Sequence, residues 1–494
     1  MDEKSDDKST LKKKIIAKDI FFVAFSNVIK LLSGVMIGFV LPKIMGEFNY
    51  GFYKTYTLYL GYVGIFHFGF CDGIYLLYAG KEYAELSKNE FRYFSRFLFC
   101  FESLIGVFIC IISLFFINTE FGFIFFFEGI SLIAVNITSY YQYISQVTKR
   151  FKELSIRNII QAILQILSVL VLYFAYKFGK VEKISFKIYV VINTVLLVAL
   201  AIWYIFTYRS ITFGKINKSS KKDIVSFRKS LLKFFKVGFP LMIANLASSL
   251  IMTIDKQFVN ILATQGIIEI SDFGVYAFAY NMLGLITTII AAISTVLYPT
   301  IKIYSEEKLK QNYIKLISYI AIITGICSMA YQPLCFIVNT WLKEYSGSLP
   351  IFRAILPGIV VSSCITMIMF NYYKALNKQF LFFIISVGVL GLSFLFDFLA
   401  FYFSANLVWI SYASVIVIFL WYFVSEFYLF KKWKFNNIRN ILYIFLLVIS
   451  FYLITYLIEN SIISMLVYFV SFSILTISFH YQLVKTFFNG LCKK

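Results

Sequence analysis

The segment Phe97–Ile117, FLFCFESLIGVFICIISLFFI, decides the fold class, because Glu102 is its one charged residue. A helix of this length spans roughly 30 Å, the thickness of the hydrocarbon core of a bilayer. The whole chain has the same character: of its 494 residues, 60% are hydrophobic, 20% are aromatic and 14% are charged. Soluble domains carry about 25% charged residues. The composition therefore excludes soluble enzymes, DNA-binding domains and secreted modules, and it predicts an all-α polytopic membrane protein.

Fourteen segments are long and apolar enough to be transmembrane helices. They are 21–41, 52–79, 97–117, 122–144, 159–176, 188–208, 237–262, 273–298, 316–338, 355–373, 380–403, 407–430, 441–458 and 462–481. The segment 52–79 is longer than one span needs, which predicts a tilt or a kink near Gly64 or Gly69.

The formal net charge of +21 is explained by where the cations lie along the chain. If the N-terminus is cytoplasmic, 36 of the 46 Lys and Arg residues lie in segments on the cytoplasmic side. This bias follows the positive-inside rule and predicts that both termini are cytoplasmic. The same charge attracts anionic lipids, so we expect these as partners, and no nucleic acid.

One connection is much longer than the others and divides the chain. It covers 209–236 and carries nine Lys and Arg residues but a single acid, Asp223. We expect an N-terminal bundle of six helices over 1–208, a basic cytoplasmic linker over 209–236, and a C-terminal bundle of six helices over 237–430. An additional helix pair and a cytoplasmic tail follow over 431–494.

A short repeat supports two related halves. Asn49–Tyr53 opens the second expected span and Asp272–Tyr276 opens the eighth, and both read polar-aromatic-Gly-apolar-Tyr. Both also lie at the expected outer face of the membrane. Transporters are often built from two such halves, with the substrate between them.

Several motifs carry a resemblance to a known family. At the end of the second span they are Phe68-Gly69-Phe70-Cys71-Asp72-Gly73-Ile74 and Tyr78-Ala79-Gly80-Lys81-Glu82-Tyr83. Later motifs are Gly238-Phe239-Pro240, Asp255-Lys256, Phe273–Tyr276 and Leu297-Tyr298-Pro299. With the helix count and the basic central loop, the chain resembles the polysaccharide-transporter (O-antigen flippase) family. This family belongs to the multidrug/oligosaccharidyl-lipid/polysaccharide (MOP) exporter superfamily.

The resemblance implies a fold, a cargo and a location. It implies two six-helix bundles in a V-shaped, MATE-like arrangement around a central cavity that works by alternating access. It implies a flippase that moves an undecaprenyl-diphosphate-linked oligosaccharide (an O-antigen, capsule, exopolysaccharide or similar repeat unit) between leaflets of the bacterial cytoplasmic membrane. The direction is from the inner to the outer leaflet. Other polysaccharide assembly proteins are candidate partners.

The best-centred charge in the expected spans is Lys30, eleven residues from both Asp19 and Leu41. That places it roughly 16 Å of helix from each end, too far for easy snorkelling. A charge at the bilayer centre costs about 2.5–3.5 kcal/mol on insertion scales. We interpret Lys30 as a cation of the cavity that attracts the diphosphate. A structural ion pair with a nearby acid is the alternative.

Four more charged residues complete the candidate substrate site. Asp255 and Lys256 are adjacent, so they point to different faces of a helix and at least one should face another helix or the cavity. A structural role for this pair is equally compatible with the sequence. Asp72 and Lys81 flank the cytoplasmic half of the second span, where an entering headgroup would pass.

Three acids are candidates for coupling transport to an ion. Glu102, Glu128 and Asp397 lie within about two to three turns of a helix end. The alternative is that each is a satisfied or snorkelled carboxylate. The chain has two histidines and seven scattered cysteines without a C-x-x-C pair, so we predict no metal site and no cofactor.

Three other functions remain open on the sequence. A MATE-like drug/cation antiporter would have mainly acids in its cavity, whereas Lys30 favours an anionic cargo. A membrane-embedded polysaccharide polymerase or ligase would need a large outside loop for its chemistry, and none is expected here. A lipid scramblase or a structural membrane protein would show no selectivity for sugars. We therefore predict a transporter and not an enzyme.

Overall fold

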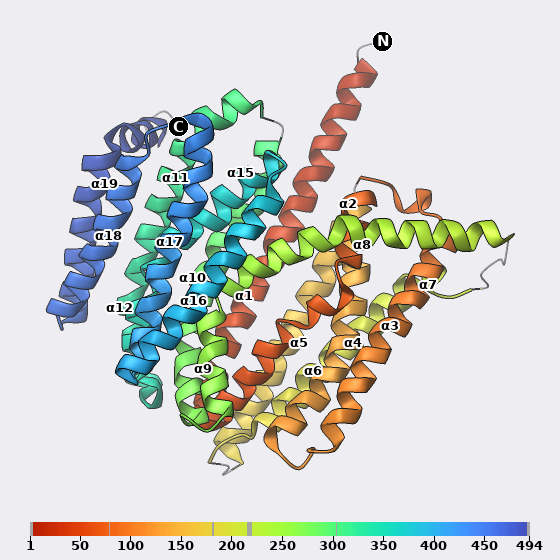
Figure 1. The fold of residues 1–494 in the computed structure, drawn as a ribbon, viewed down its shortest axis with the longest axis horizontal. Coiled ribbons are helices and arrows are strands. Elements are labelled where there is room, and N and C mark those ends of the chain that lie inside the picture. Colours follow the sequence, from red (N-terminus) through yellow and green to blue (C-terminus); the bar gives the residue numbers. More distant parts are fainter. Residues whose placement is uncertain (1–2, 79, 180–181, 215–219, 303, 492–494) are drawn as a thin grey trace. The chain divides into compact units, whose positions relative to one another are not determined.

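The computed structural model describes residues 3–78, 80–179, 182–214, 220–302 and 304–491. The regular structure in these ranges is helical (Figure 1). Ala79, which ends one expected span, lies outside the described residues, as do the side chains of 297–299 in one of the motifs. The chain divides into two compact units, Met1–Ile243 and Ala244–Lys494.

Unit 1 contains seven of the described α-helices and the start of an eighth. Their bounds are α1 Glu3–Leu60, α2 Phe70–Tyr78, α3 Lys88–Leu114, α4 Glu120–Val147, α5 Phe151–Phe178, α6 Phe186–Thr207, α7 Arg209–Thr212 and α8 Ser220–Ile251. Two 3-10 turns join them, η1 Val63–His67 and η2 Tyr83–Glu85. The region expected as a basic linker is thus mostly helical.

Unit 2 begins within α8 and continues through the remaining helices. Their bounds are α9 Ile254–Thr264, α10 Ile270–Lys302, α11 Glu306–Cys327, α12 Tyr331–Trp341, α13 Ser348–Ile355, α14 Gly358–Ser363, α15 Phe370–Ala375, α16 Gln379–Ser404, α17 Leu407–Trp433, α18 Ile438–Leu457 and α19 Ser461–Leu491. Shorter turns are η3 Ser328–Ala330, η4 Lys343–Tyr345 and the π-helical η5 Cys364–Met369.

Capping side chains fix several helix starts. Ser87 accepts a hydrogen bond from the Glu90 amide at the start of α3, and Thr119 accepts one from the Gly122 amide at the start of α4. Each satisfies one of the amides that a helix N-terminus leaves without a partner. α1 is interrupted at Gly46, whose φ of 70° is outside the helical region, so it consists of two helical segments.

The described residues contain ten helices long and apolar enough to cross a membrane. The number is eleven if the bent pair Ser348–Ile355 and Gly358–Ala375 is one span. This pair bends by 43° at Pro357, which breaks helical hydrogen bonding. The expected count of fourteen stays a prediction, because several expected spans are broken or merged with a neighbour.

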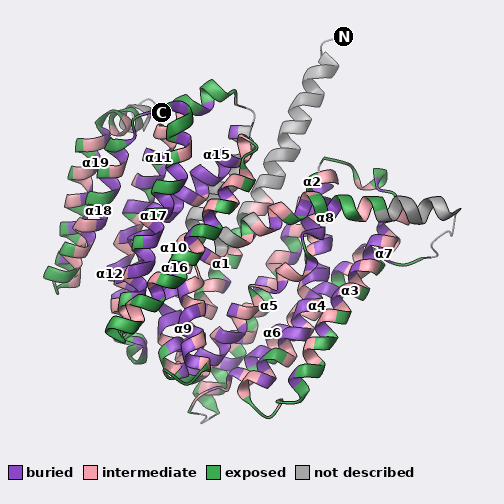
Figure 2. Ribbon diagram, in the orientation of Figure 1, coloured by how far each residue is buried: buried purple, intermediate pink, exposed green. Residues whose placement is uncertain are grey.

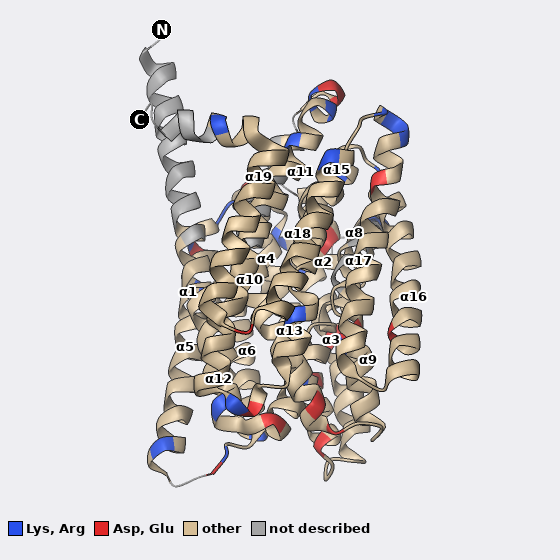
Figure 3. Cartoon of the chain, turned by 90° about the vertical axis from the view of Figure 1, so that its left-hand side faces the viewer, with Lys and Arg blue, Asp and Glu red and all other residues tan. Residues whose placement is uncertain are grey.

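Burial identifies a central helix in each unit (Figure 2). In the apolar window of α4, 56% of residues are buried, and in that of α17, 50%. The corresponding windows of α5 and α19 are only 17% and 22% buried. The exposed side chains of these outer helices are mostly apolar, as a helix needs where it faces lipid. Figure 3 shows most charged residues at the helix ends.

Candidate functional site

A buried carboxylate in unit 2 is held where one helix stops and the next begins. α8 ends at Ile251 and α9 begins at Ile254, which puts Asp255 in the first turn of α9. Its side chain is 2% exposed. Oδ1 accepts a hydrogen bond from the Lys256 amide at 2.7 Å, as an acid at a helix N-terminus commonly does. Oδ2 accepts from the Ser414 hydroxyl at 3.0 Å and the Tyr276 hydroxyl at 3.3 Å.

The second carboxyl group of this cluster comes from α16. Asp397 is fully buried, and neither of its carboxylate oxygens has a hydrogen-bond partner among the described residues. It interacts electrostatically with Asp255, and Ser414 lies beside both acids. The sequence placed Asp255 and Asp397 in different candidate sites, and the structure brings them together. Two neighbouring buried acids repel each other unless a cation or a proton neutralises one.

A small cavity opens beside Asp255. Its volume is about 20 Å³, and Asp255, Tyr280 and Ser414 supply its polar lining, while most of the other lining residues are apolar. A space of this size holds one water molecule or a bare ion of similar size. Lys256 interacts electrostatically with Asp255 but makes no salt bridge with it, and its Nζ lies 5.2 Å from the centre of the Tyr280 ring. Asp255, Asp397, Ser414 and Tyr276 are called the carboxyl pair site below.

In unit 1, the expected substrate residues do not form one cluster through hydrogen bonds or ion pairs between described residues. Lys30 is exposed on α1 and makes no ion pair with a described residue. Lys81 is exposed in the loop after α2, with its Nζ 4.6 Å from the centre of the Tyr78 ring. Asp72 is buried at the start of α2, and its Oδ2 lies 3.8 Å from His67 Nε2.

The other two coupling candidates lie on α3 and α4. Glu102 is fully buried, and its Oε2 accepts a hydrogen bond from Asn136 Nδ2 at 2.7 Å. Glu128 is 4% exposed, and both of its carboxylate oxygens lack a hydrogen-bond partner within the described part of the chain. Neither acid is a snorkelled surface group. Whether they bind an ion stays a prediction.

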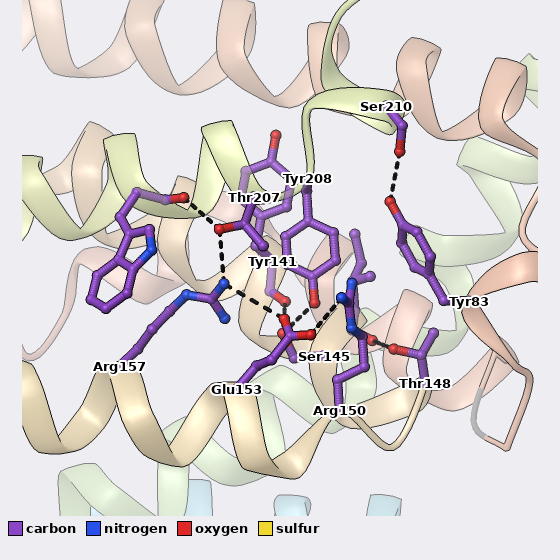
Figure 4. A network of polar contacts seen from close by, with 12 residues as sticks. Tyr83, Tyr141, Ser145, Thr148, Arg150, Glu153, Arg157, Thr207, Tyr208 and Ser210 are labelled. Atoms are coloured by element: carbon purple, nitrogen blue, oxygen red, sulfur yellow. Dashed lines mark hydrogen bonds and ion pairs between the residues drawn. The ribbon is translucent and has the colours of Figure 1, made fainter.

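Sequence reasoning missed a polar network at the end of unit 1 where α5 begins (Figure 4). Glu153 lies between two arginines, 2.5 Å from Arg150 Nη2 and 3.6 Å from Arg157 Nη2. Arg157 is 4% exposed, donates to Thr207 at 2.8 Å and stacks 4.4 Å from the centre of the Tyr204 ring. The sequence does carry a signal for this network: Glu153 follows Arg150 by three residues and precedes Arg157 by four, so all three lie on one face of a helix.

Comparison with known proteins decides the family. Residues 16–305, more than half of the chain, match the family model described as polysaccharide biosynthesis protein. The chain belongs to this family. A search of curated proteins finds no match.

Solved structures show the same fold. The chain is similar to a structure titled lipid II flippase MurJ in its inward closed conformation, with a TM-score of 0.64 and 16% identity over 95% of this chain and all of that one. An inward-facing MATE-family multidrug resistance transporter of the MOP superfamily has a TM-score of 0.59 and 12% identity, over 83% of this chain and 94% of the other. An outward-facing MATE-family transporter has a TM-score of 0.54 and 13% identity, over 85% of this chain and 97% of the other.

These findings confirm the resemblance that the motifs indicated. The chain is an integral membrane protein of this polysaccharide biosynthesis family, and its helical fold is like that of MurJ and the MATE transporters. At these identities the structural likeness shows the fold alone.

Proposed function

We propose that this protein flips an undecaprenyl-diphosphate-linked oligosaccharide from the inner to the outer leaflet of the bacterial cytoplasmic membrane. The cargo is the repeat unit of an O-antigen, a capsule, an exopolysaccharide or a similar glycan. The observation that supports this most strongly is the match to a polysaccharide biosynthesis family over residues 16–305. The likeness of 95% of this chain to a structure titled lipid II flippase adds support, because that title names a flippase with a lipid cargo.

The physical task is to move sugars and a diphosphate through about 30 Å of hydrocarbon. A polar cavity that opens to one side at a time shields them, while the polyprenyl tail stays in lipid. Lys30 is the proposed cation for the diphosphate, and it suits this role because it is exposed on α1 without an ion pair to a described residue. Asp72, Lys81 and Lys256 remain proposed contacts for the headgroup.

The carboxyl pair site is the proposed point of ion coupling. Asp255 and Asp397 are both buried, so a change in the charge of the site alters the free energy of the packed helices α9, α16 and α17 around it. Exchange of H⁺ or Na⁺ here would bias the cycle. The membrane potential adds about 2.3 kcal/mol per charge per 100 mV for an anion that moves outward.

A drug/cation antiporter is the second candidate, because that function predicts buried acids within the membrane, and Asp255 and Asp397 are such acids. Deletion of the gene separates the two. If the protein is a flippase, its loss leaves a lipid-linked saccharide on the cytoplasmic leaflet, detectable by lipid extraction and mass spectrometry. If it is an antiporter, no saccharide accumulates and the cells lose resistance to cationic drugs.

The proposal also places both termini in the cytoplasm and includes anionic lipids and other polysaccharide assembly proteins as partners. Cysteine accessibility tests the orientation. A cysteine introduced at exposed Lys434 is predicted to be protected from an impermeant reagent in intact cells, and one introduced at exposed Lys177 is predicted to react.

A further inference from the structure

The second membrane segment of unit 1 is broken in the middle. α1 ends at Leu60, a 3-10 turn follows over Val63–His67, and α2 begins at Phe70. Between them Phe68 and Gly69 have positive φ values of 47° and 79°. A break inside the membrane leaves backbone groups without helical partners, and these must be satisfied by side chains or ligands.

Side chains from the break itself and from α4 satisfy two of these groups. The Gly69 amide donates to His67 Nδ1 at 3.1 Å. Asn136 on α4 donates through Nδ2 to the Val63 carbonyl at 3.0 Å and also to Glu102 Oε2 at 2.7 Å. Because both of these neighbours are acceptors, the amide nitrogen of Asn136 must face them, which fixes the orientation of its side chain.

This orientation leaves two oxygens without partners. Glu102 Oε1 and Asn136 Oδ1 are buried and accept no hydrogen bond from a described residue. Both side chains are fully buried, and they are already joined at their other ends. A buried acceptor without a partner is costly, and a buried carboxylate is far more so.

The position of Glu102 adds to this cost. It lies on α3, five residues and so roughly 7.5 Å of helix inside the expected membrane segment 97–117. No described Lys or Arg forms an ion pair with it. The other titratable groups near the break are His67, Cys71 and Asp72 on the η1–α2 side, Tyr62 in the break itself, and Glu128 and Tyr143 on α4; Cys71 interacts electrostatically with Glu102. The region is thus short of positive charge.

We propose that the break in the second membrane segment is a site for a small monovalent cation, either Na⁺ or a proton, distinct from the carboxyl pair site of unit 2. Glu102 supplies the negative charge and one oxygen, and Asn136 supplies a neutral oxygen. A bound proton converts Glu102 into a carboxylic acid that can donate to Asn136 Oδ1. A bound Na⁺ contacts both oxygens, with water completing its shell.

Occupancy of this site would act on the shape of the membrane segment. Asn136 holds both Glu102 and the Val63 carbonyl, so a ligand that reorients the amide also changes the support of the broken turn. The site lies wholly within unit 1 and involves no cargo residue. It therefore holds whether the protein carries a lipid-linked oligosaccharide or another substrate.

Modification of Glu102 by dicyclohexylcarbodiimide, which reacts with protonated carboxyl groups in apolar surroundings, tests the proposal. The purified full-length protein is treated without cargo over a range of pH and of NaCl, with choline chloride holding the ionic strength constant. Mass spectrometry of peptides then locates the adducts. We expect modification at Glu102 and its loss in Glu102→Gln. If Na⁺ is the ligand, the modification should decrease as the Na⁺ concentration rises. If the proton is the ligand, the modification should decrease as the pH rises and should not respond to Na⁺.

Two further variants keep the test decisive. Asn136→Leu removes the neutral oxygen, so it should abolish protection by Na⁺ while Glu102 remains available for modification. Asp397→Asn alters the other site and should leave the modification of Glu102 and its protection unchanged. Absence of modification at Glu102 under every condition, or modification that neither pH nor Na⁺ changes, would overturn the proposal. Because no flipping is measured, failure of the proposed transport function would not affect this result.

Discussion

At the scale of single residues, Arg157 is the clearest case of a charge that unit 1 uses for its own stability. Its guanidinium is buried against Tyr204 and shares Glu153 with Arg150. Cation–π contacts of a desolvated arginine contribute about 2 kcal/mol. The aromatic rings of Tyr141, Tyr204 and Tyr208 stack nearly parallel, so the arginine closes a continuous packed layer.

We expect Arg157→Ala to lower the stability of the purified protein by about 2 kcal/mol, because it removes the stacking and leaves Thr207 without its donor. Thermal unfolding in detergent measures this change. Arg209→Ala is the matched control, since Arg209 is exposed near the same end of unit 1 and should change stability by less than about 0.5 kcal/mol. Equal effects of the two substitutions would show that Arg157 is not buried as described.

The carboxyl pair site gives a second prediction at this scale. If this site binds the coupling ion, Asp397→Asn removes half of the charge that attracts the ion. Na⁺ or low pH should then raise the thermal unfolding temperature of the variant by less than that of the wild-type protein. Asp272→Asn is the control, because Asp272 is exposed and accepts a hydrogen bond from the Glu269 amide at a helix start. An unchanged response in Asp397→Asn would remove the carboxyl pair site from the coupling mechanism.

How far the sequence predicts the sites depends on the kind of signal. Asp255 and Asp397 stand out as acids in apolar segments, so each was a candidate from sequence. Their proximity depends on how α9, α16 and α17 pack, and local patterns carry no information on that packing. Arg157 was overlooked because it lies next to the basic end of its span, where a cation is expected on the surface.

At the scale of elements, the close crossing of α2 and α8 within unit 1 depends on glycine (Figure 1). A Cβ on Gly73 would lie 2.5 Å from the Phe234 carbonyl oxygen, and one on Gly238 would overlap the Gly69 carbonyl oxygen. These contacts are with backbone, which cannot move aside as a flexible side chain can. The two helices can approach this closely because no side chain separates them.

Gly238→Ala should therefore force α2 and α8 apart, at a cost of about 3 kcal/mol or more. The measurement is the fraction of monodisperse protein on size exclusion together with its thermal unfolding temperature. Gly388→Ala is the control: Gly388 lies inside α16 with open space around it, so alanine should be neutral or stabilise the helix by about 0.5–1 kcal/mol. A stable Gly238→Ala protein would contradict the described crossing.

The sequence predicted the break in the second segment more closely than it predicted the helix count. The excess length of 52–79 pointed to a kink near Gly64 or Gly69, and the structure has left-handed backbone at Phe68 and Gly69. Expected spans such as 355–373 are less regular, because Pro357 and the π-helical turn η5 interrupt them. Hydropathy averages over about twenty residues and does not register such local breaks.

At the scale of the whole molecule, the distribution of charge connects the fold to the proposed transport. The middle of the helices is mostly apolar, and most charged residues are at their ends (Figure 3). Among the charged residues inside the membrane segments, Lys30 is the one that the proposal assigns to the diphosphate of the cargo. An anionic headgroup that moves outward from a negative interior gains free energy from the membrane potential.

If this gain drives the cycle, a potential imposed on proteoliposomes by a potassium gradient and valinomycin should accelerate flipping, and dissipating it should slow flipping. The expected gain is about 2.3 kcal/mol per charge per 100 mV. Liposomes containing the potassium gradient but no valinomycin are the control. Equal rates with and without the potential would rule it out as the driving force, although flipping itself could persist.

The most direct measurement of the central claim is flipping of a fluorescent undecaprenyl-diphosphate oligosaccharide in proteoliposomes, followed by the access of an impermeant glycosidase to each leaflet. We predict that the wild-type protein moves the lipid between leaflets and that Lys30→Gln slows this by about tenfold, equivalent to roughly 1.4 kcal/mol. Lys177→Gln, which removes an exposed charge, should behave as wild type. Movement of a cationic drug without movement of the lipid-linked oligosaccharide would contradict the claim.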